Sequence, residues 1–182
     1  MSAPRLEKGL LQVYTGDGKG KTTAALGLSL RALGAGLNVA FIQFIKGSMD
    51  SSELAMLSRL GPRFWLKRFA KEFSPFSLGR GEPTEEDRRA VAQAWKIAEQ
   101  VIHSGRWDLV VLDEINNVLR FGLLEVEKLV DTLRSRPSHV EVVCTGRGAP
   151  ARLIDAADLV TEFKCVKHPY EKGIGARKGI EY

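Results

Sequence analysis

The amino-acid sequence predicts an α/β fold, built on a mostly parallel six-stranded sheet with helices on both faces. Strand and helix patterns alternate along the chain, and most predicted strands are short runs that are apolar nearly throughout. Such runs are typical of parallel strands covered on both sides. A glycine-rich segment also joins the first predicted strand directly to the first predicted helix. Together these observations predict an open α/β sheet that binds its ligand at one edge.

The first predicted strand is the apolar run at 10–13, which ends where the glycine-rich segment begins. An alanine- and leucine-rich segment at 21–35 then predicts a helix that ends among glycines. Only Ser29 and Arg31 interrupt the later apolar character of this segment. We therefore expect this helix to be buried on most sides.

The next segment of the chain predicts two strands with a short helix between them. The run NVAFIQFI predicts a strand at 38–45, and 51–60 predicts a short helix. Weak alternation predicts a third strand at 64–69. The stretch 70–83 has no clear period and carries glycines and prolines near its end. It predicts a long loop, a feature that is often functional in compact domains.

The second half of the chain repeats the alternation of helices and strands. Thr84 to Asp87 resembles a capping box, which opens a helix. The apolar residues that follow recur at three- and four-residue spacing and so predict a helix, which Gly105 would end. The later predicted elements are a strand at 109–112, a helix at 124–134, a strand at 140–144, a helix at 151–156 and a strand at 159–163.

Composition places the chain among ordinary globular proteins. It has 182 residues, of which 44% are hydrophobic and 27% charged, and we expect a single domain over 1–182. We expect 1–8 to form a short N-terminal arm and 164–182 to form a tail over the site. No apolar stretch approaches the roughly 20 residues that cross a bilayer, and the first residues lack a secretion signal. These features predict a cytoplasmic protein.

The charge and the cysteines narrow the classes of partner. The net charge is +5, yet Lys and Arg are scattered among 22 acidic residues with no run of five basic residues. We therefore expect small anions such as ATP as partners, and neither nucleic acid nor a membrane. Cys144 and Cys165 form no C-x-x-C pair, so a structural zinc site is not expected. Cys144 ends an apolar run, which predicts a buried thiol.

The segment YTGDGKGKTT, from Tyr14 to Thr23, predicts a phosphate-binding loop. Its glycines allow a tight turn whose backbone N–H groups face phosphate oxygens at a helix N-terminus. The general pattern would place glycine at 15, where this chain has Thr15. The predicted ATP-binding residues are Gly16, Asp17, Gly18, Lys19, Gly20, Lys21 and Thr22.

Individual side chains of this loop have different predicted roles. Lys21 is the predicted catalytic residue, because its ammonium group would contact the terminal phosphates. The hydroxyl of Thr22 is a predicted ligand of Mg²⁺. The sequence leaves open whether Lys19 adds charge to the site or points to solvent, and whether Thr23 is a ligand or a packing residue.

Two acidic residues follow the predicted strand at 109–112. At the carboxyl end of a parallel strand, Asp113 and Glu114 would lie opposite Thr22, so both are predicted to hold Mg²⁺ directly or through water. They would otherwise simply end the strand and cap the next segment. Arg147 also follows a strand at this edge, and either a phosphate contact or a backbone role fits it.

The combination of these segments resembles one known family from about Gly9 to Tyr182. The loop TGDGKGKTTAA, the strand NVAFIQFIKG, the strand VVLDE, the turn TGRG and the ending VKHPYEKG…KGIEY are similar to those of P-loop corrinoid adenosyltransferases. Thr15 in place of the first loop glycine is also a feature of that family. The resemblance implies a P-loop NTPase (RecA-like) fold.

The resemblance also implies an activity. The family transfers the 5′-deoxyadenosyl group of ATP to Co(I) of a reduced corrinoid and releases triphosphate, in adenosylcobalamin biosynthesis or salvage. It binds ATP across the loop in the orientation opposite to that of most P-loop enzymes. Lys21 and Thr22 match its phosphate and metal positions, and Glu114 matches its acidic metal ligand. A homodimer and a flavoprotein or reduced-flavin reductant are also implied.

Contact with the corrinoid is implied for the aromatic residues of the long loop. An aromatic pair in the family helps to displace the lower axial ligand of cobalt, which makes reduction of Co(II) easier. Phe73 matches the first member, whereas Pro75 stands in the place of the second, a Trp, with Phe76 beside it. Phe73 and Phe76 are therefore the predicted corrinoid-binding residues, although such aromatics would equally anchor the loop on the core.

Two other functions fit a phosphate loop. A nucleotide or nucleoside kinase would need an acceptor site with a carboxylate base and an arginine-bearing lid, for which only Arg88 and Arg89 offer themselves. A RecA-like ATPase module acting on nucleic acid would need a clustered basic strip with interleaved aromatics, which the sequence lacks. A kinase would produce ADP, whereas adenosyl transfer would leave triphosphate.

Overall fold

The computed structural model describes residues 5–44, 53–57, 59–69 and 82–180, and it contains one six-stranded sheet. The strands are β1 (Leu11–Thr15), β2 (Val39–Gln43), β3 (Phe64–Arg68), β4 (Leu109–Asp113), β5 (Glu141–Thr145) and β6 (Leu159–Glu162). Their order is β3-β2-β4-β5-β1-β6, and neighbouring strands pair in parallel. The predicted α/β class and parallel sheet are confirmed.

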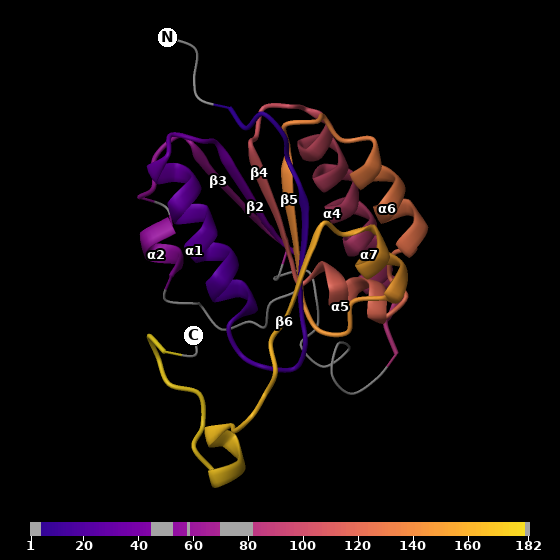
Figure 1. Cartoon of the computed structure of the whole chain (residues 1–182). Coiled ribbons are helices and arrows are strands. Elements are labelled where there is room, and N and C mark those ends of the chain that lie inside the picture. The colour runs from indigo at the N-terminus through magenta and orange to yellow at the C-terminus, as the bar shows by residue number, and fades with distance from the viewer. Residues whose placement is uncertain (1–4, 45–52, 58, 70–81, 181–182) are drawn as a thin grey trace.

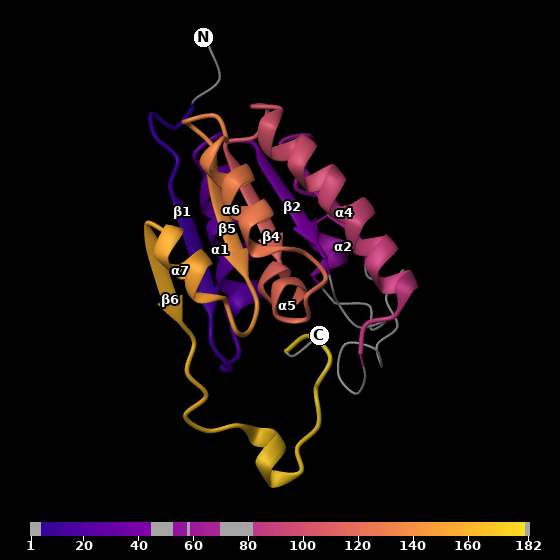
Figure 2. The ribbon, with the colours of Figure 1, turned by 90° about the vertical axis from the view of Figure 1, so that its right-hand side faces the viewer.

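Helices cover both faces of this sheet. The helices of the described residues are α1 (Lys21–Gly34), α2 (Leu54–Leu57), α4 (Glu85–His103), α5 (Ile115–Arg120), α6 (Val126–Arg134) and α7 (Ala151–Ala156). The short 3₁₀ helix η2 (Pro169–Lys172) lies below the sheet, in the C-terminal segment. Figure 1 shows α1 and α2 on one face of the sheet and α4, α6 and α7 on the other. The view in Figure 2 looks onto the face that carries α6 and α7.

The apolar strands divide the core into two halves. Val110 and Leu112 of β4 pack in the cluster that includes α4 and α6, whereas Leu109 and Val111 pack in the cluster that includes α1. This division follows from the alternation of side chains along a strand. Since both sets are buried, positions 109–112 of β4 are all apolar, which is why the sequence shows a continuous run there.

Helix α1 is less buried than the sequence predicts. Its buried side chains are Lys21, Ala25, Ser29 and Ala32, which form one stripe at helical spacing, whereas Leu30 is 53% exposed. The expectation of burial on most sides is therefore wrong. The sheet covers only the stripe that faces it, so apolar residues elsewhere on α1 remain in contact with solvent.

The predicted capping box at the start of α4 is confirmed. The backbone N–H of Asp87 donates to Thr84 Oγ1 at 3.2 Å, and the N–H of Thr84 donates to Asp87 Oδ2 at 2.8 Å. Each side chain therefore satisfies a backbone donor that the first turn leaves without a helical partner. Asp87 performs this role in the place of the usual Glu or Gln.

Most boundaries lie within two residues of the predicted ones, but two elements of the described residues, α5 and η2, were not predicted. The six residues of α5 and the four residues of η2 are too short to show a helical period. Helix α6 begins at Val126 rather than at 124. Strand β5 covers Glu141–Thr145, one residue later than predicted.

Because the six strands are parallel, their carboxyl ends lie together at one edge of the sheet and their amino ends at the opposite edge. Figure 1 shows the C-terminal segment running below the carboxyl edge of the sheet, while the chain enters β1 from the opposite edge. Near that opposite edge, the Arg5 guanidinium donates to the carbonyl of Gly105 at 3.1 Å. Among the described residues no helix is both long and apolar enough to span a bilayer.

Candidate functional site

The glycine-rich loop between β1 and α1 packs directly on the end of β6. The N–H of Gly18 donates to the carbonyl of Phe163 at 2.6 Å. A Cβ atom at Gly16 or Gly18 would lie 2.5 or 2.7 Å from that carbonyl oxygen. Gly16 and Gly20 also have positive φ values of 94° and 120°. Glycine is therefore required here for close backbone approach as well as for turning.

Thr15, the residue that departs from the general loop pattern, connects three segments. Its carbonyl accepts the N–H of Phe163 at 2.8 Å, and its Oγ1 accepts the N–H of Ala149 at 3.1 Å. The threonine hydroxyl thus satisfies a backbone donor in the turn before α7. A glycine at 15 would leave that donor without this partner.

Lys21 is buried at the start of α1, with only 7% of its surface exposed. Its Nζ donates to the carbonyls of Gly16 and Gly18 at 2.6 and 2.8 Å, so the side chain folds back over the loop. Burial lowers the pKa of Lys21 below its usual value, and the Glu114 carboxylate partly offsets this effect. A partly desolvated cation on a loop of N–H groups is suited to binding a polyanion.

Asp113 lies at the end of β4 and is completely buried. Thr22 Oγ1 and Thr145 Oγ1 donate to its Oδ1 at 2.9 and 2.7 Å. Gln43 Nε2 donates to its Oδ2 at 3.1 Å. This carboxylate therefore joins the start of α1 to the ends of β2 and β5, and it fixes the direction in which the Thr22 hydroxyl proton points.

Glu114 follows with a left-handed backbone, φ 65°, which is uncommon outside glycine. Its N–H donates to Thr145 Oγ1 at 3.0 Å, and its carboxylate accepts a hydrogen bond from Asn117 Nδ2. The Asn117 Oδ1 accepts the N–H of Arg147 at 2.7 Å. The left-handed backbone turns the two neighbouring side chains in different directions. The carboxylate of Asp113 is buried, whereas that of Glu114 faces a cavity.

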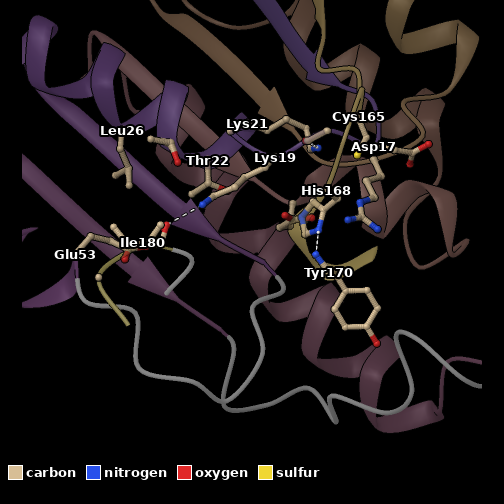
Figure 3. Close-up of a pocket in the computed structure, with 16 residues that line it drawn as sticks. Asp17, Lys19, Lys21, Thr22, Leu26, Glu53, Cys165, His168, Tyr170 and Ile180 are labelled. Atoms are coloured by element: carbon tan, nitrogen blue, oxygen red, sulfur yellow. Dashed lines mark hydrogen bonds between the residues drawn. The ribbon is translucent and has the colours of Figure 1, made fainter. Parts of the chain in front are cut away.

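A cavity of about 980 Å³ lies beside the loop, and Figure 3 shows its lining. The lining residues are Asp17, Gly18, Lys19, Gly20, Lys21, Thr22, Thr23, Leu26, Glu53, Glu114, Arg147, Cys165, His168, Tyr170, Gly179 and Ile180. Lys19 Nζ donates to the carbonyl of Ile180 at 2.9 Å, so it contacts the C-terminal segment. His168 Nδ1 accepts the N–H of Tyr170 at 3.2 Å and caps η2.

The structure brings most of the predicted site residues together. The loop residues from Asp17 to Thr22 line the cavity with Glu114, whereas Asp113 lies behind Thr22. Phe73 and Phe76 lie outside the described residues. Sequence reasoning missed Gln43, Asn117 and Thr145. An available signal was the pair of asparagines at 116 and 117, which lies one residue beyond the segment VVLDE.

The two cysteines differ sharply in environment, and this difference predicts their reactivity. Burial raises the pKa of the Cys144 thiol to about 12, whereas Cys165 is exposed and lines the cavity. Because the thiolate is the reactive form, we expect iodoacetamide to label Cys165 alone in the native protein and both residues after unfolding. ATP with Mg²⁺ should slow labelling of Cys165. Mass spectrometry of the labelled peptides measures both effects, and labelling of native Cys144 would contradict the expectation.

Comparisons with known proteins connect this site to a family. Residues 7–182 match the sequence model of the ATP:corrinoid adenosyltransferases BtuR/CobO/CobP. A corrinoid adenosyltransferase of Pseudomonas aeruginosa is 41% identical over 183 residues, covering 98% of this chain and 86% of the relative. Corrinoid adenosyltransferase CobA of Salmonella typhimurium is 38% identical over 176 residues, covering 97% and 87%.

Solved structures with low sequence identity share the fold. The flagellar accessory protein FlaH of Methanocaldococcus jannaschii has a TM-score of 0.53 at 12% identity, covering 86% of this chain and 72% of that chain. The RadB recombinase has a TM-score of 0.51 at 17% identity, covering 90% and 78%. At these identities the likeness bears on the fold alone, and the predicted P-loop, RecA-like fold is confirmed.

Proposed function

This chain belongs to the ATP:corrinoid adenosyltransferase family BtuR/CobO/CobP, and on that premise we propose how its residues carry the reaction. The family that the sequence resembles is thereby confirmed. The protein is an enzyme that transfers the adenosyl group of ATP to a corrinoid. The alternatives of a kinase or a RecA-like ATPase module are not favoured.

We propose that the phosphate loop from Gly16 to Thr22 binds the triphosphate of ATP, with Lys21 as the cation on the terminal phosphates. The supporting observation is the convergence of Lys21 and Arg147 on one cavity beside the loop. Lys21 now donates to two loop carbonyls, and a phosphate oxygen offers its ammonium group a stronger, charged acceptor. Asp17 and Lys19 of the same loop also line this cavity.

The residues around Thr22 fit a divalent cation with a preference for oxygen ligands. Thr22 and Glu114 line the same cavity, and together they present a hydroxyl and a carboxylate beside the phosphate loop. We propose that these two residues hold Mg²⁺, which would neutralise charge on the phosphates. Because Thr22 donates its proton to Asp113, the lone pairs of its oxygen are left for the cation. Asp113 would thus act through Thr22 or through water.

The chemistry that this site supports is displacement at carbon. In the proposed reaction, Co(I) supplies the electron pair for the new Co–C5′ bond, the C5′–O bond breaks, and triphosphate leaves with that electron pair. No proton is removed from the nucleophile, so no catalytic base is required. The work of Lys21 and the loop amides is to stabilise the charge that develops on the leaving oxygen.

The remaining substrate contacts and cellular partners are also proposals. Phe73 and Phe76 would contact the corrinoid, supported by the resemblance of their segment to the family. We propose a single domain over 1–182 whose tail at 164–182 covers the nucleotide. The support is that five tail residues line the cavity: Cys165, His168, Tyr170, Gly179 and Ile180. A homodimer, a flavoprotein reductant and a cytoplasmic location are proposed from the family and from the requirement for ATP.

Product analysis tests this function. The protein is incubated with ATP, Mg²⁺ and chemically reduced cobalamin, and the corrinoid spectrum is followed before and after illumination. We expect a light-sensitive product with a new Co–C bond and one equivalent of triphosphate. Formation of ADP would indicate a kinase, and phosphate release stimulated by nucleic acid would indicate an ATPase module. Either result without a light-sensitive corrinoid would overturn the proposal.

A further inference from the structure

The first turn of helix α5 contains two asparagines, Asn116 and Asn117, that do not belong to the phosphate loop. The amide group of Asn117 uses both of its ends: Nδ2 donates to the Glu114 carboxylate, and Oδ1 accepts the backbone N–H of Arg147 at 2.7 Å. Glu114 follows β4 and Arg147 follows β5, so one side chain joins the ends of two neighbouring strands. Both joined residues line the cavity, whereas Asn117 lies behind them.

Close packing holds the backbone of Asn117 in place. The neighbouring Asn116 is completely buried, and its Nδ2 donates to the carbonyls of Tyr14 and Gly146 at 3.2 and 3.1 Å. Gly146 has φ 128°, and a Cβ there would lie 3.1 Å from both Asn116 Cβ and the backbone nitrogen of Asn117. The first turn of α5 therefore rests directly on the turn that carries Arg147.

Glu114 needs such support because its backbone conformation is unfavourable. A left-handed backbone is unfavourable for a non-glycine residue such as Glu114, and it persists only where its surroundings hold it. The hydrogen bond to Thr145 fixes the N–H of Glu114, but it leaves the side-chain torsions undetermined. The bond from Asn117 restrains the carboxylate itself.

We propose that Asn117 is a positioning residue that fixes the Glu114 carboxylate at the cavity and couples its orientation to the Arg147 turn. Asn117 does not line the cavity, so its effect would pass through Glu114 and Arg147, the two residues that it holds. The inference rests on the proposed role of Glu114 as a ligand of the cation. It adds that the affinity for MgATP depends on a hydrogen bond donated from outside the ligand set.

Binding of ATP over a series of Mg²⁺ concentrations tests this inference without a corrinoid. Isothermal titration calorimetry is applied to the wild type, Asn117→Leu, Asn117→Asp and Glu114→Gln, with the melting temperature of each. Leucine keeps the volume of Asn117 without a donor or acceptor. Aspartate keeps the acceptor for Arg147 but cannot donate to Glu114. Mg²⁺ should increase the affinity for ATP, and the measured quantity is the Mg²⁺ concentration that gives half of this increase. We expect this concentration to be about tenfold higher in both Asn117 variants, because loss of a partner that holds a metal ligand typically weakens metal binding by this factor.

Asn38→Ala is the matched control. Asn38 Nδ2 also donates to a carboxylate, Asp108 Oδ2 at 3.2 Å, but these residues directly precede β2 and β4 and so lie at the opposite edge of the sheet. We expect this variant to lose stability while its Mg²⁺ requirement stays at the wild-type value. Turnover with reduced cobalamin at saturating Mg²⁺ should recover substantially in Asn117→Leu and remain at the wild-type level in Asn38→Ala.

The possible results distinguish failure of this inference from failure of the proposed role of Glu114 as a ligand of the cation. If Asn117→Leu has the wild-type Mg²⁺ requirement while Glu114→Gln needs more Mg²⁺, the role of Asn117 is refuted and the proposed cation site is retained. An unchanged requirement in Glu114→Gln would overturn the cation site, and the inference with it. Full restoration by Asn117→Asp would show that the bond from Arg147 alone matters, which also contradicts the role assigned to Glu114.

Discussion

Replacement of Lys21 by alanine is expected to abolish adenosyl transfer, with a fall in kcat/KM of at least about 10²- to 10³-fold. Its Nζ is the ammonium group held over the phosphate loop by two carbonyls, and the side chain is only 7% exposed. Negative charge grows on the leaving oxygen as the C5′–O bond breaks, so this cation stabilises the transition state more than the bound substrate. The loss should therefore fall mainly on kcat.

Two further variants separate charge from packing at Lys21. Lys21→Met retains most of the side-chain volume without the charge, and we expect it to be as inactive as Lys21→Ala while melting closer to the wild type. Lys96→Ala removes an exposed lysine of α4 and should leave the rate unchanged. The measurement is the initial rate with ATP and pre-reduced cob(I)alamin. Near-normal turnover in Lys21→Met would refute the catalytic assignment.

Replacement of Gly18 by alanine is expected to damage both the loop and its contact with β6. The new Cβ would lie 2.7 Å from the carbonyl oxygen of Phe163 and 2.8 Å from the carbonyl carbon of Lys164. These are backbone atoms, so the loop must shift and the hydrogen bond from the Gly18 N–H must lengthen. Such overpacking typically costs about 1–3 kcal/mol, or roughly 2–12 °C in melting temperature for a protein of this size.

ATP binding should also weaken in Gly18→Ala. If displacement of the loop costs about 1.4 kcal/mol of binding free energy, the affinity for ATP falls about tenfold. The matched control is Gly27→Ala, since apart from the adjoining backbone of α1 no atom of the described residues lies within 4 Å of a Cβ at this position. Removal of a helical glycine should raise stability by about 0.5–1 kcal/mol and leave ATP affinity unchanged. Calorimetry and thermal unfolding measure the two effects, and wild-type ATP affinity in Gly18→Ala would contradict the predicted loop geometry.

The fold could be predicted from the sequence wherever a pattern extends over a whole element. The apolar runs of β2, β4 and β5 are continuous because both faces of the sheet are covered. The order of the strands and the exposure of Leu30 could not be read in this way. Both depend on which elements pack together, and α1 carries apolar residues on a side that the sheet does not cover.

The site could be predicted only as far as its motifs are local. Lys21 and Thr22 are identified by their distance from the loop glycines, and Asp113 by its place after a strand. Gln43 meets Asp113 across 70 positions of sequence, and Asn117 meets Arg147 across 30. No periodicity encodes such pairs. They arise because parallel strands deliver their carboxyl ends to one edge, where residues distant along the chain become neighbours.

The left-handed backbone at Glu114 has a consequence for engineering this enzyme. Glycine or asparagine adopts that conformation more readily than glutamate. A library selected for heat resistance alone should therefore accumulate glycine or asparagine at this position. Each gain in melting temperature there would remove the carboxylate that we propose binds the cation. Selection for thermal stability should consequently keep Glu114 unchanged. Otherwise we expect the selected variants to be thermally stable but inactive.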